Sequence, residues 1–490
     1  MQQLNPIDAA LLLMETVKTP CHISMISVYD PSTCPDKAPS FEEIFEAVRV
    51  SLPAANRFRS KIVRVPFDLD YAYWVEDEDF DLRFHMRHLA LPKPGSWVQF
   101  REQVSRLVSR PLDMTRPPWE MTVIEGLDSI KGLPPGCFAT VLKIHHCAID
   151  GESGVGLATV LHQDSPDKPV AVLEDNWQPE VTPGNRELLR RAGIHSIRKP
   201  LAIAKLLMSN SSKLLRSALD DLRSDKKEED ARDRKVPATI FNAPVSAHRI
   251  FDEARCTLDE LKLIRKEVPG ATINDVCLTI VSEGMRRYLD AKGELPAESL
   301  VTAVPISTRT PENAGASGNQ VSVIFTSMHT DIVNPIERLA AISAETREKK
   351  AVQSGVVMKV LLEVVHNLPG ALVGAVGRVM PVISVNAKAV INTMVTNVPG
   401  PMTPLYLLGA KLVQSSGCPP LLHGGALLHS VSSYNGGFMV SFTACRDLLP
   451  DPDFYRQCLE EAMRDMIAAA GGGAKPKRAP RKPRAKKAVS

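Results

Sequence analysis

The feature that most constrains the fold is the stretch 138–151, where an apolar run ends in a group of polar residues. Residues 138–144 are mostly apolar and β-branched, which predicts a buried β-strand. His145, His146, Asp150 and Gly151 follow directly. Because neighbouring strand residues point to opposite faces, only one of the two histidines can face a given cavity. The stretch therefore predicts a sheet with a rigidly mounted polar site at the end of one strand.

A histidine mounted in this way suits general base catalysis. A neutral imidazole with a pKa near ~6.5 takes a proton from a hydroxyl or an amine at neutral pH. Asp150 would hold the loop or orient an imidazole, and Gly151 suits a tight turn. Two alternatives stay open, a purely structural role and a metal site, although adjacent histidines diverge and no carboxylate pattern completes a coordination shell. Cys147, among apolar neighbours, is interpreted as a packing residue rather than a nucleophile.

The motif HHxxxDG resembles the signature of the CoA-dependent acyltransferase superfamily, which includes chloramphenicol acetyltransferase and the condensation domains of peptide synthetases. Further segments resemble one branch, the bacterial wax ester synthase/diacylglycerol acyltransferase family, in that family's order. They are NPIDA at 5–9, PCHI at 20–23, WVED at 74–77, FDL at 80–82, LPKPG at 91–95, PLD at 111–113, RPPWE at 116–120, NDV at 274–276, VPIS at 304–307 with Arg309, GN at 318–319 and TNVPGP at 396–401. The resemblance covers residues 4–467. One departure is Pro118, where the family usually has leucine, and this puts the local packing in doubt.

This resemblance implies an α/β fold of two chloramphenicol-acetyltransferase-like domains, each a mixed sheet with helices, around a central channel. It implies transfer of a long-chain acyl group from acyl-CoA, a cosubstrate, to diacylglycerol or a long-chain alcohol. The product would be triacylglycerol or wax ester, with no metal and no redox cofactor. In this interpretation His146 is the general base, His145 supports it, and Asp150 and Gly151 shape the loop.

Six further residues at the ends of predicted elements are candidates for substrate binding: Asn274, Asp275, Ser307, Arg309, Thr396 and Asn397. For the first two the alternative is helix capping, because Thr272 precedes them at a predicted helix start. Arg309 would meet a phosphate of CoA or tie down its own loop. Thr396 and Asn397 precede a Pro-Gly-Pro turn at a strand end, where they could face the cleft. The apolar segment 356–395 is either a core helix or the lining for an acyl chain.

The chain length of 490 residues suits two domains. We predict an N-terminal domain over 1–180, an interdomain linker over 181–245, a C-terminal domain over 246–470 and a disordered basic tail over 471–490. Helices are predicted over 6–17, 40–52, 97–109, 259–267, 272–292 and 454–470, and strands over 22–29, 58–65, 72–75, 300–305, 320–328, 406–414, 429–434 and 437–443.

The linker contains a basic amphipathic segment at 186–222, interrupted at Pro200. Such a helix either lies on an anionic membrane or packs on the body as a crossover helix with a solvated basic face. The tail carries eight Lys and Arg residues and no acid, whereas the net charge of the whole chain is only +3. Its charge suits anionic lipid headgroups, and without an aromatic platform it is weak evidence for a nucleic-acid partner.

Compartment and partners follow from what the sequence lacks. Nine scattered cysteines without a CxxC pair indicate reduced thiols in a cytoplasmic protein. There is no signal-peptide pattern and no run of ~20 apolar residues. We therefore expect peripheral association with the inner face of the plasma membrane or with lipid inclusions. The alternative functions are a related acyltransferase with an amine or carrier-bound acceptor, and a non-catalytic lipid-binding protein of the same fold.

Overall fold

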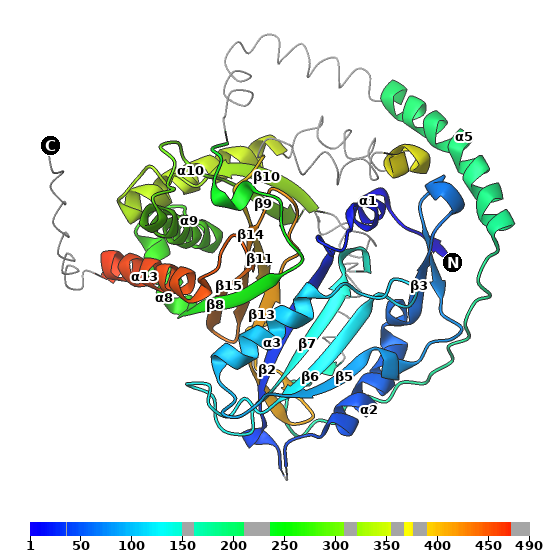
Figure 1. Ribbon diagram of the computed structural model, residues 1–490, viewed down its shortest axis with the longest axis horizontal. Helices are drawn as coiled ribbons and strands as arrows, with labels where there is room; N and C mark the ends of the chain where they lie inside the picture. The colour runs from blue at the N-terminus through cyan, green and yellow to red at the C-terminus, as the bar shows by residue number, and fades with distance from the viewer. Residues whose placement is uncertain are drawn as a thin grey trace, which may run out of the picture.

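The computed structural model describes residues 1–35, 37–148, 161–209, 236–307, 321–353, 367–375 and 390–471. Within these ranges the protein is mixed α/β, with two six-stranded sheets and one three-stranded sheet. Figure 1 shows the two larger sheets next to each other, with most helices of the C-terminal half gathered beyond the second sheet. The predicted class of mixed sheets with helices is confirmed.

The first sheet has the strand order β12-β13-β2-β7-β6-β5. Its strands are β2 (His22–Asp30), β5 (Met86–Ala90), β6 (Trp119–Glu125), β7 (Phe138–His145), β12 (Tyr406–Leu407) and β13 (Ala410–Cys418). Neighbours run antiparallel except the parallel pair β5 and β6. Every residue of β7 is buried. The cause is that helix α2 (Phe41–Ser51) packs on one face of the sheet and α3 (Trp97–Ser109) on the other, which explains the continuous apolar run.

The second sheet has the order β10-β9-β11-β14-β15-β8. Its strands are β8 (Arg249–Thr257), β9 (Val301–Ser307), β10 (Val321–Ser327), β11 (Thr393–Pro399), β14 (Leu427–Tyr434) and β15 (Gly437–Cys445). Helices α8 (Leu258–Lys266), α9 (Ile273–Lys292), α10 (Pro335–Gln353) and α13 (Pro452–Gly471) pack together on one side of it (Figure 1). Their apolar faces and the sheet enclose the largest buried cluster among the described residues.

A small sheet of β1 (Gln2–Gln3), β4 (Tyr73–Glu76) and β3 (Ser60–Val63) flanks the first half. Helix α1 (Pro6–Met14) follows β1, and the side chain of Asn5 caps it by accepting the N–H of Asp8 at 2.8 Å. The helix predicted over 6–17 therefore ends three residues earlier than expected. Most other predicted elements differ from the observed bounds by one or two residues, as helix and strand ends commonly do.

The predicted domain boundaries do not follow the sheets at one place. β12 and β13 lie in the range predicted as the C-terminal domain, yet β13 pairs with β2 and completes the first sheet. It also contacts the second sheet, because Ser432 Oγ donates to the carbonyl of Ser415 at 2.8 Å and Ser441 Oγ donates to that of Gly417 at 2.7 Å. The two halves are thus joined by a shared strand as well as by the linker.

In the described part of the linker, the long helix α5 (Asn185–Ser209) runs along the outside of the molecule (Figure 1). Leu188 and Ala192 on its inner side are buried against the small sheet. His195 Nδ1 and Lys199 Nζ lie 2.5 and 3.0 Å from the two carboxylate oxygens of Asp70. This face of α5 packs on the body, as expected for the crossover helix that was one of the two predicted alternatives.

The predicted interruption at Pro200 is wrong, because α5 continues through this residue. A proline removes one helix hydrogen bond, and the carbonyl left without a helix partner is that of Ser196, which is exposed and can bond to water. The rest of the segment predicted to 222 lies outside the described residues. In the part of the chain that the structure describes, no helix has both the length and the apolar character needed to cross a bilayer.

Candidate active site

Two main-chain hydrogen bonds fix the point where β7 ends. The N–H of His145 donates to the carbonyl of Pro118 at 2.9 Å, and the N–H of His146 donates to the carbonyl of Cys21 at 2.8 Å. The chain then enters the 3₁₀ helix η6 (His146–Ala148), which packs against α1. The histidine turn is therefore held by the segments that lead into β6 and β2 and by the N-terminal helix.

The departure from the family pattern at Pro118 is accommodated. This residue supports the turn through its main-chain carbonyl, which proline retains. The neighbouring Trp119 is buried; its Nε1–H donates to the carbonyl of Phe58 at 2.8 Å, and its ring stacks on His85 with centroids 4.7 Å apart. The segment therefore packs tightly despite the substitution.

His145 lies behind the strand end with an exposed fraction of 0%. Its Nδ1 accepts the N–H of Cys147 at 3.2 Å, so in a neutral ring the proton sits on Nε2. Nε2 lies 3.6 Å from a carboxylate oxygen of Glu15, whose other oxygen accepts the N–H of Cys21 at 3.1 Å. Glu15 was not a candidate in the sequence, because nothing in the pattern around it links it to the histidines.

His146 is half-buried, and its Nδ1 is fully buried without a hydrogen-bond partner among the described residues. Burial lowers the pKa of His146 below its ordinary value; its own main-chain carbonyl partly opposes this, and the neighbouring His145 adds to the lowering. The ring is therefore neutral at pH 7 and can accept a proton. The two histidines thus have different surroundings, as the alternation of strand side chains predicted.

Cys147 touches His145 but is not placed to act as a nucleophile. Its Sγ lies 2.8 Å from His145 Nδ1, the kind of contact that can activate a thiol. However, the side chain is 2% exposed, and burial raises the pKa of the Cys147 thiol well above its ordinary value. The side chain packs with Leu4 and Ala9 in the core beneath α1.

Asp275 is occupied by helix capping. Its Oδ2 accepts the N–H and the hydroxyl of Thr272, both at 2.8 Å, and its Oδ1 accepts the hydroxyl of Thr346 at 2.8 Å. The N–H of Asp275 donates to Thr272 Oγ1 in return, which completes a capping box at the start of α9. These contacts account for the burial of this carboxylate, and Asn274 lies beside it in the same turn.

Ser307, Thr396 and Asn397 lie at one edge of the second sheet. β9 and β11 are parallel neighbours, so Ser307 at the end of β9 falls close in register to Asn397 near the end of β11. Thr396 Oγ1 lies 3.4 Å from the carbonyl of His429, and Asn397 is exposed. Asp150, Gly151 and Arg309 lie outside the described residues, as does most of the apolar segment 356–395. The assignment of substrate binding to the six candidates therefore stays a prediction; they are Asn274, Asp275, Ser307, Arg309, Thr396 and Asn397.

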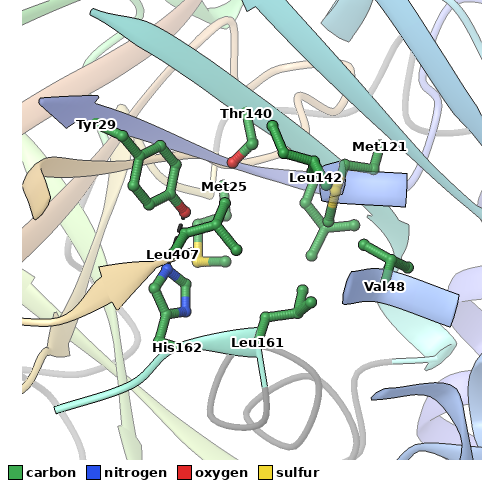
Figure 2. A pocket seen from close by; sticks show the side chains of 10 residues that line it. Met25, Tyr29, Val48, Met121, Thr140, Leu142, Leu161, His162 and Leu407 are labelled. Carbon is green, nitrogen blue, oxygen red and sulfur yellow. Dashed lines mark hydrogen bonds between the residues drawn. The ribbon is translucent and has the colours of Figure 1, made fainter. Parts of the chain in front are cut away.

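An apolar pocket lies between α2 and the face of the first sheet that carries Thr140 and Leu142. Figure 2 shows the side chains that line this small pocket; they include Met25, Val48, Leu142 and Leu161. At one end of the pocket the hydroxyl of Tyr29 lies 2.9 Å from His162 Nε2. Burial raises the pKa of Tyr29 to about 12, so the phenol stays neutral. No sequence pattern indicated this pair, because its members lie 133 positions apart.

Asp150, the carboxylate that follows the two histidines in the motif, lies outside the described residues. Across the described ranges, no group of three or more His, Cys, Asp or Glu side chains could hold a metal ion. The chemistry that the described part of the turn offers is proton transfer by the neutral imidazole of His146.

Two family profiles and a curated relative match the chain over both of its halves. The "Wax ester synthase/diacylglycerol acyltransferase catalytic domain" profile matches residues 4–277, and the "WS/DGAT C-terminal domain" profile matches residues 317–467. A Mycobacterium tuberculosis protein named as a diacylglycerol O-acyltransferase is 30% identical over 95% of this chain and 90% of its own length.

Solved structures give the same result. The wax ester synthase/diacylglycerol acyltransferase from Marinobacter aquaeolei VT8 superimposes with a TM-score of 0.66 at 25% identity, covering 96% of this chain and 100% of that one. The trichothecene 15-O-acetyltransferase from Fusarium sporotrichioides, at 11% identity with a TM-score of 0.55 and 95% coverage of each chain, shares the fold. The two profiles between them span both halves, so the chain belongs to the wax ester synthase/diacylglycerol acyltransferase family.

Proposed function

We propose that this protein transfers a long-chain acyl group from acyl-CoA to the hydroxyl of diacylglycerol or of a long-chain alcohol. The observation that carries the proposal is the half-buried, neutral imidazole of His146 at the end of β7, in a chain that belongs to this family over both halves. The names of its relatives agree with both acceptor classes.

The proposed reaction is a direct transfer with His146 as general base. Because Nδ1 is buried, Nε2 is the nitrogen that would take the hydroxyl proton while the oxygen attacks the thioester carbon. The tetrahedral oxyanion then collapses, the C–S bond breaks, and the departing thiolate of CoA takes the proton from the imidazolium. A thiol has a pKa near ~8.5, so the thiolate leaves readily and no acyl-enzyme is needed.

The other predicted residues have supporting roles in this proposal. His145, Asp150 and Gly151 would hold the histidine turn. Asn274, Ser307, Arg309, Thr396 and Asn397, together with Asp275 as part of the cap of α9, would line the approach of CoA and acceptor; they are the proposed substrate contacts. Acyl-CoA serves as cosubstrate. The thioester is already activated, so the reaction calls for no metal and no redox cofactor.

An acceptor panel tests the proposal. Palmitoyl-CoA is offered with ethanol, hexadecanol, diacylglycerol or hexadecylamine, the release of free thiol is followed, and the products are resolved by chromatography. We expect esters with hexadecanol or diacylglycerol at rates at least tenfold above ethanol, because each buried methylene of the acceptor adds about 0.8 kcal/mol of binding. Preferred amide formation would favour the amine-acceptor alternative. If no acceptor gives any release of free thiol, the result would favour a non-catalytic lipid-binding protein.

We also propose that the protein associates peripherally with an anionic membrane surface or lipid inclusion on the cytoplasmic side, through the outer face of α5. Arg186, Arg190, Ile194 and Lys205 are exposed and lie opposite the docked side of this helix. A helix with basic and apolar side chains on one face can lie at a lipid interface. The tail, of which residues 472–490 lie outside the described ranges, would add further attraction.

Vesicle sedimentation tests this membrane contact. Each basic residue near an anionic surface contributes about 1 kcal/mol. The triple variant Arg186→Gln, Arg190→Gln, Lys205→Gln should therefore bind vesicles of phosphatidylglycerol about a hundredfold more weakly. Deletion of residues 475–490 measures the contribution of the tail, and vesicles of phosphatidylcholine control for charge. Unchanged sedimentation of the triple variant would remove α5 from the proposal.

A further inference from the structure

Glu15 lies where helix α1 ends, and its carboxylate faces the segments that hold the histidine turn. After this residue a tight turn, closed by hydrogen bonds between Thr16 and Thr19, leads the chain toward β2. Oε1 of Glu15 accepts the N–H of Cys21 at 3.1 Å, and Oε2 lies 3.6 Å from His145 Nε2. The side chain of Glu15 is only 14% exposed. One largely buried carboxylate therefore contacts both the approach to β2 and the end of β7.

Both groups that face this carboxylate are hydrogen-bond donors. The main-chain nitrogen of Cys21 can only donate. His145 Nδ1 accepts the N–H of Cys147 at 3.2 Å, so the neutral ring carries its proton on Nε2, the nitrogen nearest Glu15. Two donors require two acceptors, which a carboxylate offers and an amide does not. A glutamine of the same size at position 15 could therefore satisfy only one of the two groups.

The proton on His145 Nε2 depends on Glu15 for a counterpart. Nε2 is fully buried and makes no hydrogen bond within the described ranges. Its separation of 3.6 Å from Glu15 Oε2 exceeds a hydrogen bond, yet leaves no room for a bridging water. A buried N–H without an acceptor destabilises the fold, and a carboxylate at this distance in a buried site offsets that cost by electrostatic attraction. Glu15 thus favours the tautomer in which Nδ1 is free to hold Cys147.

The same carboxylate acts on His146 through the main chain of Cys21. Glu15 accepts the N–H of Cys21, and the carbonyl of Cys21 accepts the N–H of His146 at 2.8 Å. Helix α1 also packs against η6, which begins at His146. Catalysis by a positioned group is sensitive to its placement, because a misplacement of about 1 Å can cost about 10²-fold in rate.

We infer that Glu15 is a positioning residue for the histidine turn, which holds His145 in the Nε2–H form and, through Cys21, fixes the main chain of His146. This inference rests on the proposed function, in which His146 is the base. Glu15 acts through its neighbours and takes no proton from the substrate. The role requires two acceptor oxygens at the reach of a glutamate.

Glu15→Gln tests the assignment with palmitoyl-CoA and hexadecanol. We expect kcat to fall about 10²-fold, because the base is displaced, while the KM of each substrate changes little, because no substrate contact is lost. Glu15→Asp should also lower kcat, because it keeps the charge but is one methylene too short to reach both donors. Rates are measured below the melting temperature of each variant, so that all the protein is folded.

Glu345→Gln is the matched control. Oε1 of Glu345 accepts the N–H of Ser327 at 3.1 Å, Oε2 lies 2.9 Å from His329 Nε2, and the side chain is 15% exposed. These contacts repeat those of Glu15 in the second half of the protein, away from the histidine turn. The control variant should lose stability and keep its kcat. An equal loss of kcat in both variants would assign the effect to general destabilisation and overturn the inference.

The tautomer of His145 gives a readout that does not depend on activity. In protein labelled with ¹⁵N-histidine, the ring-nitrogen shifts distinguish the Nε2–H form from the Nδ1–H form, and His145→Gln identifies the signals of this ring. We expect the Nε2–H form in the unaltered protein and its loss in Glu15→Gln. The inference fails if Glu15→Gln keeps this form or its kcat.

If Glu15→Gln does not fold, the unaltered protein still decides, because a ring of His145 that carries its proton on Nδ1 would contradict the inference. Absence of thiol release from the unaltered protein with every acyl-CoA would instead overturn the proposed function and leave the tautomer measurement unaffected.

Discussion

Replacing His146 with alanine is expected to lower kcat by a factor of about 10² to 10⁴ with palmitoyl-CoA and hexadecanol, the usual contribution of a general base. The KM for acyl-CoA should change little, because the imidazole takes the proton of the acceptor rather than holding CoA. Thiol release gives the rate, and the melting temperature shows whether the variant is folded. His88→Gln is the control, since this histidine is exposed on β5 and pairs with Glu125.

The pH dependence of the same reaction gives a second observable. A general base acts only when unprotonated, so kcat/KM should fall as the pH drops through the pKa of the free enzyme's imidazole. Burial lowers the pKa of His146, so the midpoint should lie below the ordinary histidine value of ~6.5. Equal thiol release by the alanine variant and the unaltered protein would contradict the assignment of His146 as base.

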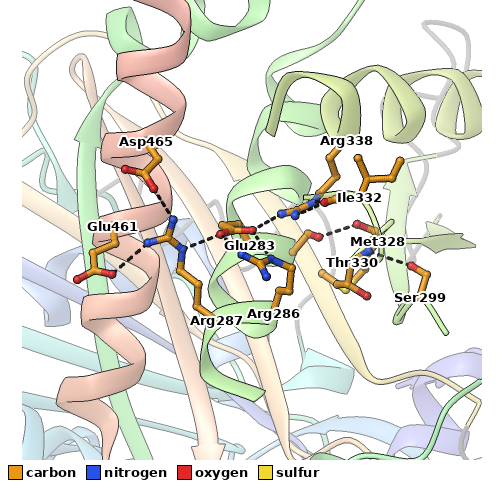
Figure 3. Close-up of polar contacts among 11 residues, drawn as sticks. Glu283, Arg286, Arg287, Ser299, Met328, Thr330, Ile332, Arg338, Glu461 and Asp465 are labelled. Atoms are coloured by element: carbon orange, nitrogen blue, oxygen red, sulfur yellow. Dashed lines mark hydrogen bonds and ion pairs between the residues drawn. The ribbon is translucent and has the colours of Figure 1, made fainter. Parts of the chain in front are cut away.

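Replacing Glu283 with glutamine is expected to destabilise the protein by about 3 to 5 kcal/mol, the range for breaking a buried ion pair. Figure 3 shows this carboxylate among three arginines. Arg286 Nε and Arg338 Nη1 donate to Oε2 at 2.7 and 2.6 Å, and Arg287 Nε donates to Oε1 at 2.7 Å. Arg338 is 0% exposed, so the substitution leaves its guanidinium buried without a counter-charge. Urea unfolding at pH 7, followed by circular dichroism, measures the loss.

The sign of the pH effect follows from the same contacts. Burial alone would raise the pKa of Glu283, but the hydrogen bonds from Arg286 and the charge of Arg338 outweigh it and lower the pKa to about 2. A carboxylate with a depressed pKa stabilises the fold above its unfolded pKa of ~4.3. That contribution is lost between this value and about 2. The difference between Glu283→Gln and the unaltered protein should therefore shrink as the pH falls through this window.

Glu42→Gln is the matched control for this cluster. Glu42 also pairs with an arginine, Arg83, but both side chains are more than half exposed, so its loss should cost less than 1 kcal/mol. Equal urea midpoints for the Glu283 and Glu42 variants would contradict a large contribution of the Glu283 ion pairs to the free energy of unfolding.

Local patterns predicted the parts of the site that the chain builds from neighbouring residues. The apolar run before His145 predicted β7, and the alternation of strand side chains predicted different surroundings for His145 and His146. Thr272 and Asp275 predicted the cap of α9. Contacts between distant residues were not predictable in this way. Glu15 reaches His145 across 130 positions only because α1 folds back over η6. The pairing of Tyr29 with His162 and the shared strand β13 depend on tertiary packing that no local period encodes.

The shared strand also sets an order of assembly on the ribosome. β2 is made within the first 30 residues, whereas its neighbour β13 ends at Cys418. Until residue 418 of the 490 has been translated, β2 keeps one edge unpaired, and such an edge can pair with another chain. The first sheet, and with it the strand that carries the histidines, therefore reaches its final form only near the end of synthesis, although its other strands are among the earliest to emerge.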